Sequence, residues 1–143
     1  MNLEVVPFRP YHLEILAIQG VQPAQQVSLV PATYANFQRP PGPALTVFEG
    51  DRVILSGGIA SINARHGVLW AVLSPLAGRH MLFLHRGVKR FIDCQPVKRL
   101  EATTELGFWH GCRWLKLLGF KYEGKMPGFG DAGETHLRFG MIR

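Results

Sequence analysis

Residues 108–124 read Phe-Trp-His-Gly-Cys-Arg-Trp-Leu-Lys-Leu-Leu-Gly-Phe-Lys-Tyr-Glu-Gly, and this stretch decides the fold. Its apolar side chains recur at helical spacing as far as Leu118, which predicts an amphipathic helix over residues 108–118. Gly119 follows as the cap, because glycine tolerates the left-handed conformation in which many helices end. Phe120 then begins a strand that we expect to reach Met126. The stretch therefore predicts a helix that leads directly into a strand.

Alternating apolar residues and turn signals predict the remaining elements. Gly50-Asp51 marks a tight hairpin turn, and Gly57-Gly58 predicts a bulge or a close approach within a long strand. Pro10 begins a helix with Leu13, Leu16 and Ala17 as its buried stripe. Further strands are expected at residues 3–8, 44–49, 52–63, 68–73, 97–104 and 135–142, and further helices at 10–20, 32–37 and around 81–91.

The order of these elements predicts an α/β fold. A strand, a crossover helix and another strand in the middle of the chain imply a parallel pair inside a mostly antiparallel sheet. We expect one domain over residues 1–143, with a twisted mixed sheet flanked by helices, because this length suits a single hydrophobic core.

Composition narrows the class of protein. Hydrophobic residues make up 47% and charged residues 18%, as in folded globular proteins. No apolar run approaches the roughly 20 residues that cross a bilayer, and the first residues do not resemble a secretory signal, so we expect no membrane partner. Cys94 and Cys112 fall on predicted helices, where buried free thiols and a reducing compartment are expected. The net charge of +6 favours polyanionic partners.

Several short motifs together carry a resemblance to a known family. They are Ala71-Val72-Leu73-Ser74-Pro75, Gly78-Arg79-His80, Arg99-Leu100-Glu101-Ala102-Thr103, Arg113-Trp114-Leu115, Leu118-Gly119-Phe120 and Glu123-Gly124-Lys125-Met126. The chain resembles the GNAT superfamily of acyl-CoA-dependent N-acyltransferases. Within it, the chain is most similar to a GNAT-like phage family related to internal virion protein A. The resemblance implies a GNAT fold over nearly the whole chain, with acetyl-CoA or another acyl-CoA as a possible cofactor and no metal.

The cofactor loop that the resemblance implies is degenerate. Active GNATs hold the CoA pyrophosphate with backbone N–H groups of a glycine-rich loop at a helix N-terminus. Residues 74–81 keep one glycine of that pattern, Gly78. Arg79 and His80 can meet phosphate at the start of the helix, or they only solvate its end. The candidate cofactor contacts are Leu73, Ser74, Gly78, Arg79, His80 and Gly111.

The residues that would support catalysis also depart from the family pattern. Phe108 and Leu115 stand where active members often carry an Asn that contacts CoA and a Tyr that protonates the leaving thiolate. Tyr122 lies beyond the helix and is a poor substitute. Glu101 is the candidate general base; the favoured alternative is a structural Glu that pairs with a nearby arginine such as Arg99 or Arg113. The spacing of the histidines predicts no zinc site.

Two features of residues 107–118 indicate contacts with a ligand, a neighbouring element of the fold or a partner protein. Gly107 and Gly111 are four residues apart and predict a close approach on one helix face, by a pantetheine arm or by a neighbouring element. Trp109 and Trp114 cannot share a face, so one of them, for which we choose Trp109, is expected to be exposed at a protein interface.

Two functions are compatible with these patterns. The missing Tyr, the missing glycines and the phage resemblance favour a virion assembly or internal virion component with degenerate or lost acyltransferase activity. Its partners would be virion or host proteins, and its location the bacterial cytoplasm or the virion. The alternative is an acyl-CoA-dependent N-acyltransferase that acetylates an amine. The stripe of Arg86, Lys89 and Arg90 is weak evidence for nucleic acid, because it lacks interleaved aromatic residues.

Overall fold

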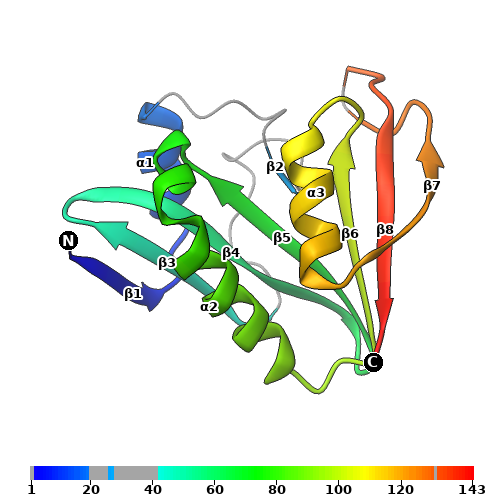
Figure 1. Ribbon diagram of the computed structural model, residues 1–143, viewed down its shortest axis with the longest axis horizontal. Helices are drawn as coiled ribbons and strands as arrows, with labels where there is room; N and C mark the ends of the chain where they lie inside the picture. Colours follow the sequence, from blue (N-terminus) through cyan, green and yellow to red (C-terminus); the bar gives the residue numbers. More distant parts are fainter. Residues whose placement is uncertain (1, 20–25, 28–41, 131) are drawn as a thin grey trace.

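The computed structural model describes residues 2–19, 26–27, 42–130 and 132–143 of the chain. The described strands form one sheet in the order β1-β3-β4-β5-β2-β6-β8-β7 (Figure 1). The helices are α1 (Tyr11–Ile18), η3 (Pro75–His80, a 3₁₀ helix), α2 (Met81–Asp93) and α3 (Trp109–Leu118). The strands are β1 (Leu3–Pro7), β2 (Gln26–Val27), β3 (Ala44–Glu49), β4 (Arg52–Asn63), β5 (His66–Leu73), β6 (Arg99–Glu105), β7 (Lys121–Met126) and β8 (His136–Ile142).

A short parallel pair lies at the centre of the sheet, as the sequence predicts. β5 and β6 run parallel through His66↔Arg99, Gly67↔Leu100 and Val68↔Glu101, whereas the other pairings are antiparallel. Beyond these three residue pairs the two strands separate toward their carboxyl ends, with β2 between them (Figure 1). β2 pairs with Ala71 and Val72 on one side and with Thr104 on the other. The sheet is therefore continuous although its central strands diverge.

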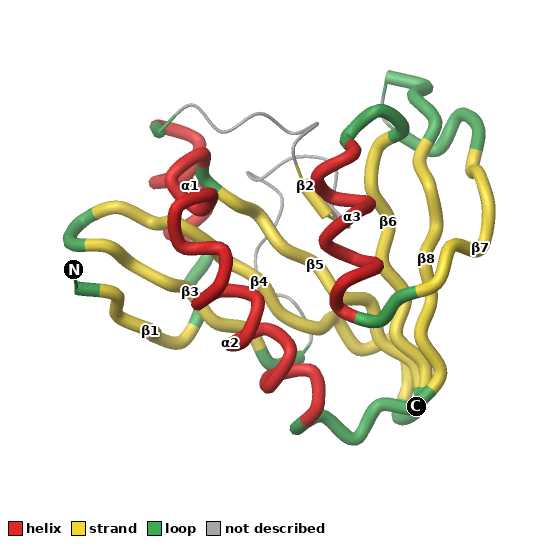
Figure 2. The backbone as a smooth tube through the Cα atoms, in the orientation of Figure 1, coloured by secondary structure: helices red, strands yellow, loops and turns green. Residues whose placement is uncertain are grey.

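Helices cover both faces of the sheet. α2 and α3 cross the near face in Figure 2, over a core that includes Leu69, Leu100 and Leu115. α1 packs on the other face through Leu13 and Leu16, in a smaller core with Trp70. Because successive residues of a strand point to opposite faces, β4 and β5 contribute to both cores.

The amphipathic helix predicted at residues 108–118 forms as α3. α3 buries Trp114, Leu115 and Leu118, and it ends at Gly119, whose φ of +105° is the left-handed conformation that favours glycine. Gly57 and Gly58 allow the predicted close approach: a Cβ at Gly57 would lie 2.8 Å from the carbonyl oxygen of Trp70.

Other local expectations are wrong or lie outside the described residues. Gly107 precedes α3 in a turn with φ of +102°, so it does not share a helix face with Gly111. Ala17 is exposed and does not join Leu13 and Leu16. Cys94 is exposed beyond the end of α2; Cys112 is buried, and that burial raises the pKa of its thiol. The predicted helix at 32–37 lies outside the described residues.

Candidate functional site

A cleft of about 520 Å³ opens where β5 ends and separates from β6. One wall is the end of β5, η3 and the start of α2, and the other wall is α3. We call it the cleft throughout. Four of the predicted cofactor contacts line it together, namely Leu73, Ser74, Gly78 and Gly111. Their role in binding stays a prediction.

In the first turn of η3, backbone N–H groups already donate hydrogen bonds within the turn. The N–H of Leu76 donates to Ser74 Oγ over 3.0 Å, and the N–H of Ala77 donates to the carbonyl oxygen of Ser74 over 2.9 Å. Pro75 has no N–H to offer. A diphosphate at this turn would therefore compete with hydrogen bonds that the fold already makes, unlike one at a helix start with free N–H groups.

Arg79 and His80 are held away from the cleft lining by a carboxylate. Arg79 Nη2 donates to Glu49 Oε1, and His80 Nε2 lies against Glu49 Oε2, both over 2.7 Å. Neither residue lines the cleft. The hydrogen bond from Arg79, with a smaller one from His80, holds the pKa of Glu49 below its usual value. The two residues thus tie η3 to β3, and their predicted contact with a cofactor phosphate stays a prediction.

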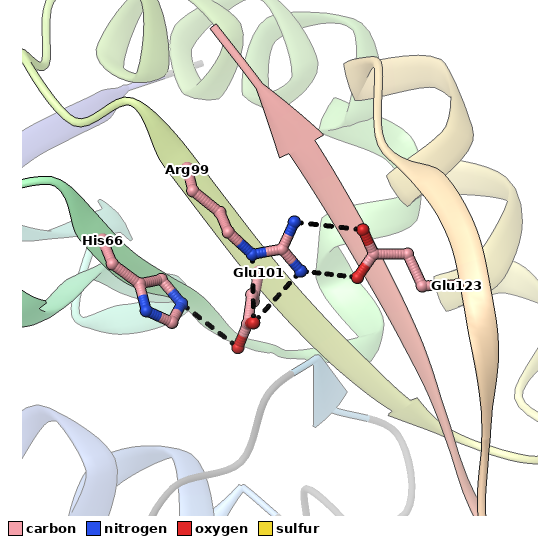
Figure 3. A network of polar contacts seen from close by, with 4 residues as sticks. All are labelled: His66, Arg99, Glu101 and Glu123. Carbon is pink, nitrogen blue, oxygen red and sulfur yellow. Dashed lines mark hydrogen bonds and ion pairs between the residues drawn. The ribbon is translucent and has the colours of Figure 1, made fainter.

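Glu101 lies in an ion-pair network on the face opposite α2 and α3. Its neighbours Leu100 and Ala102 point into the core beneath those helices, so the Glu101 side chain points the other way. Figure 3 shows Arg99 between two carboxylates: its Nε and Nη2 donate to Glu101 Oε1 over 3.2 and 3.1 Å, and its Nη2 donates to Glu123 Oε1 over 2.6 Å. His66 Nε2 lies 3.3 Å from Glu101 Oε2.

This network identifies the arginine that pairs with Glu101. It is Arg99, and Arg113 forms no ion pair with Glu101. Gly140 leaves room for the network, because a Cβ there would overlap the Glu123 carboxylate. Hydrogen bonds from Arg99 lower the pKa of Glu123. Glu101 does not line the cleft, and its role as a general base stays a prediction.

Gly111 is surrounded closely on its inner side. A Cβ at this position would lie 2.6 Å and 2.8 Å from two ring carbons of Phe108 and 2.8 Å from Thr104 Oγ1. The predicted close approach therefore comes from a residue of the same helix start and from β6. Phe108, at the position of the missing Asn, lines the cleft, whereas Leu115 is fully buried in the core.

Several residues that line the cleft were not predicted as site residues. His110, Arg113 and Trp114 line the α3 wall together with Leu117. Trp114 is 6% exposed, and its Nε1–H has no acceptor among the described residues. Arg113 is exposed and forms no ion pair or side-chain hydrogen bond within the described part of the chain. The sequence contains a signal that could have found them, because positions 110, 113, 114 and 117 are spaced so that they share one face of the predicted helix.

The described part of the chain shows neither a metal-binding cluster nor a helix that could span a membrane. No group of three or more His, Cys, Asp or Glu side chains there is arranged to hold a metal ion. None of the helices described is long and apolar enough to cross a membrane.

Comparison with known proteins relates the fold to one class of enzyme. No family model matches the sequence, and no curated protein matches it as a relative. Among solved structures, the chain is similar to Ard1 from Thermoplasma volcanium (TM-score 0.75, 11% identity, 99% of this chain and 98% of that one). It is also similar to the ribosomal-protein-S18-alanine N-acetyltransferase from Escherichia coli (TM-score 0.69, 11% identity, 99% and 94% covered).

A third solved structure agrees with these two. The ribosomal-protein-S5-alanine acetyltransferase from Vibrio fischeri has a TM-score of 0.68 and 15% identity, with 99% of this chain and 93% of that one covered. Identities this low show a shared fold and not a shared activity. The parallel pair β5–β6, its divergence at the cleft and these likenesses together show that the chain has the fold of the GNAT N-acetyltransferases.

Proposed function

We propose that this protein is an acyl-CoA-dependent N-acyltransferase whose acyl donor lies in the cleft. The observation that carries the proposal is the position of the cleft, at the point where the parallel strands β5 and β6 separate and a helix begins. Ligands of open α/β sheets commonly bind at the carboxyl ends of parallel strands. The likeness to N-acetyltransferases over nearly the whole chain supports the same class of chemistry.

The residues of the cleft fit one part of acyl-CoA better than the other. Leu73, Phe108 and Leu117 offer an apolar wall to a pantetheine arm, and the unpartnered indole N–H of Trp114 offers a hydrogen bond to the thioester carbonyl oxygen at its end. The first turn of η3 does not fit the diphosphate, because its donors are already used. In this proposal Arg113 binds phosphate in place of the loop, since a guanidinium forms strong paired hydrogen bonds with phosphate oxygens.

Bound acyl-CoA would supply an activated acyl group as a thioester. The amine nitrogen of the acceptor forms a bond to the thioester carbonyl carbon as the carbon–sulfur bond breaks, and the nitrogen loses a proton. His110 is the imidazole among the described residues that line the cleft, and an imidazole can accept that proton at neutral pH. Among the described residues no tyrosine lines this cleft; Tyr122 lies on β7 against Phe139. In this proposal no described tyrosine protonates the leaving thiolate, and transfer depends mainly on positioning.

Binding of acetyl-CoA tests this proposal. In calorimetry and thermal unfolding, a ligand at 100 times its Kd adds about 2.7 kcal/mol to the stability of the folded state. We expect clear stabilisation at sub-millimolar acetyl-CoA. Arg113→Gln should weaken binding roughly tenfold or more, because it removes charge-assisted hydrogen bonds.

A matched control keeps the charge change but leaves the cleft intact. Arg52 is exposed at the start of β4 and does not line the cleft, so Arg52→Gln should bind acetyl-CoA as the wild type does. Absence of stabilisation by acetyl-CoA in the wild-type protein would contradict the proposal.

A role in virion assembly remains a second candidate, and the exposure of Trp109 favours it. Trp109 is 64% exposed at the start of α3, where a docking partner can bury it. In this proposal the partner is a virion or host protein, the basic surface sets the salt dependence, and the protein works in the bacterial cytoplasm or the virion. Capture of virion proteins by wild type and Trp109→Ala at two salt concentrations tests it. Loss of a partner at both salts supports docking, and an unchanged set of partners argues against Trp109 as the anchor.

A further inference from the structure

A second cavity, which we call the α2 cavity, lies between α2 and the sheet. It has a volume of about 330 Å³. Its floor includes Val47, Leu55 and Leu69 from β3, β4 and β5, and its roof includes Leu84 and Phe91 from α2. Arg90, which is exposed, is its one charged lining residue among those described. A cavity of this size with apolar walls suits an apolar ligand.

Trp114 connects the α2 cavity to the cleft. It lines both, and its indole N–H is buried with no acceptor among the described residues. A buried donor normally finds a partner, because an unsatisfied one costs free energy. A ligand with a carbonyl oxygen at the junction would accept a hydrogen bond from this indole N–H, and an apolar chain beyond the carbonyl would fill the α2 cavity.

The sheet limits where such a chain can go. β2 pairs with Ala71 and Val72 of β5 and with Thr104 of β6, so backbone fills the gap between the diverging strands. A chain that extends inward from the cleft therefore meets a closed sheet, and it cannot pass between β5 and β6 to the opposite face. The α2 cavity, on the same face as the cleft, is the apolar volume that Trp114 places next to it.

We propose that the acyl donor of this protein is a medium-chain acyl thioester whose chain occupies the α2 cavity. The indole N–H of Trp114 donates to the thioester carbonyl oxygen at the junction. This inference rests on the proposed function and specifies its substrate class. The transfer is the one described above: the acceptor nitrogen gains the acyl carbon, and the CoA sulfur leaves as a thiolate.

Calorimetry with CoA, acetyl-CoA, octanoyl-CoA and sodium octanoate tests the proposal. We expect octanoyl-CoA to bind at least about tenfold more tightly than acetyl-CoA, since each methylene removed from water adds affinity. Val47→Phe fills part of the α2 cavity and should remove most of this advantage, with acetyl-CoA affinity unchanged. Val6→Phe is the matched control, because Val6 lies on β1 and does not line the cavity.

A second variant keeps the proposal testable if Val47→Phe does not fold. Trp114→Phe retains an aromatic ring but removes the N–H, so it should weaken both acyl-CoA esters about tenfold and leave CoA itself, which has no thioester carbonyl, little changed. Equal loss for CoA and its esters would overturn the role of Trp114.

The remaining outcomes separate this inference from the proposed function. If neither CoA nor its esters bind, the proposed function fails. If CoA and acetyl-CoA bind but octanoyl-CoA binds no more tightly, the function stands and the chain in the α2 cavity is wrong. Octanoate that binds well while octanoyl-CoA gains nothing would make the cavity a separate fatty-acid site, which also overturns the proposal.

Discussion

Two helical glycines show how strongly the surroundings of one residue decide its effect on stability. Gly111 in α3 faces the Phe108 ring and Thr104 Oγ1, whereas a Cβ on Gly87 in α2 would meet nothing within 4 Å. Both sit within helices, where glycine costs about 0.8–1 kcal/mol relative to Ala. Only at Gly111 does the neighbouring structure explain why no side chain is present.

The same substitution at both glycines should therefore change stability in opposite directions. We expect Gly111→Leu to lower the free energy of unfolding by roughly 1–3 kcal/mol through overpacking. We expect Gly87→Leu to raise it by up to about 0.8 kcal/mol through helix propensity. Urea unfolding measures both values. A neutral Gly111→Leu would show that the Phe108 ring moves aside at little cost.

Single residues of the candidate site were predictable only where the chain itself fixes their place. Ser74 follows directly after β5 and Gly78 lies in the short helix η3 that comes next, so the strand end brings both to the cleft with Leu73. Arg79 and His80 follow one and two residues later, yet Glu49 from a distant strand holds them elsewhere. In the sequence, nothing distinguishes Trp114 from a tryptophan that is simply buried in a core. Whether its indole N–H finds an acceptor depends on the residues that pack around it in the fold.

At the scale of elements, length and periodicity decided what could be predicted. α3 and the long strand β4 carry repeated apolar positions and clear ends, and both form as expected. β2 has two residues and no periodicity, so it exists only because β5 and β6 offer it backbone partners. No local sequence pattern predicts a strand this short.

The docking of α1 on the sheet depends on a buried polar chain. The backbone N–H of Arg9 donates to His12 Nδ1 over 3.1 Å, and Thr46 Oγ1 lies 2.7 Å from the same nitrogen. Thr46 Oγ1 is in turn 2.9 Å from Ser56 Oγ. Because Nδ1 accepts from Arg9, the proton of the neutral ring is on Nε2. The chain connects α1 to β3 and β4.

This polar chain should make stability depend on pH through His12. Burial, with the charge of Arg9, lowers the pKa of His12, so the unfolded state takes up a proton more readily than the folded state. Stability should fall as the pH drops below about 6.5, the ordinary value for histidine, until the lowered pKa is passed.

Urea unfolding between pH 7.5 and 5.5 measures this effect. His12→Gln should be less stable at pH 7.5 but lose less stability toward pH 5.5 than the wild type. His110→Gln is the control, since His110 is exposed and lies outside this polar chain. Equal pH slopes in wild type and His12→Gln would show that His12 titrates alike in both states.

For the whole molecule, one sheet joins two cores of unequal size. The larger core lies beneath α2 and α3, and the smaller one beneath α1, with β4 and β5 contributing residues to both. A chain of 143 residues with a shared central sheet should unfold as one unit. Both cores are built on β4 and β5, so loss of one core also removes the strands on which the other packs.

One substitution in each core tests this cooperativity. Leu16 and Leu115 are both fully buried, in the smaller and larger core respectively. Leu16→Ala and Leu115→Ala should each lower the free energy of unfolding by about 2–5 kcal/mol. In both variants, tryptophan fluorescence and far-ultraviolet circular dichroism should give the same urea midpoint, since Trp70 and Trp114 report on opposite faces of the sheet. Separate midpoints in Leu16→Ala would mean that α1 leaves the sheet before the rest unfolds, and the sheet would then join two units of independent stability.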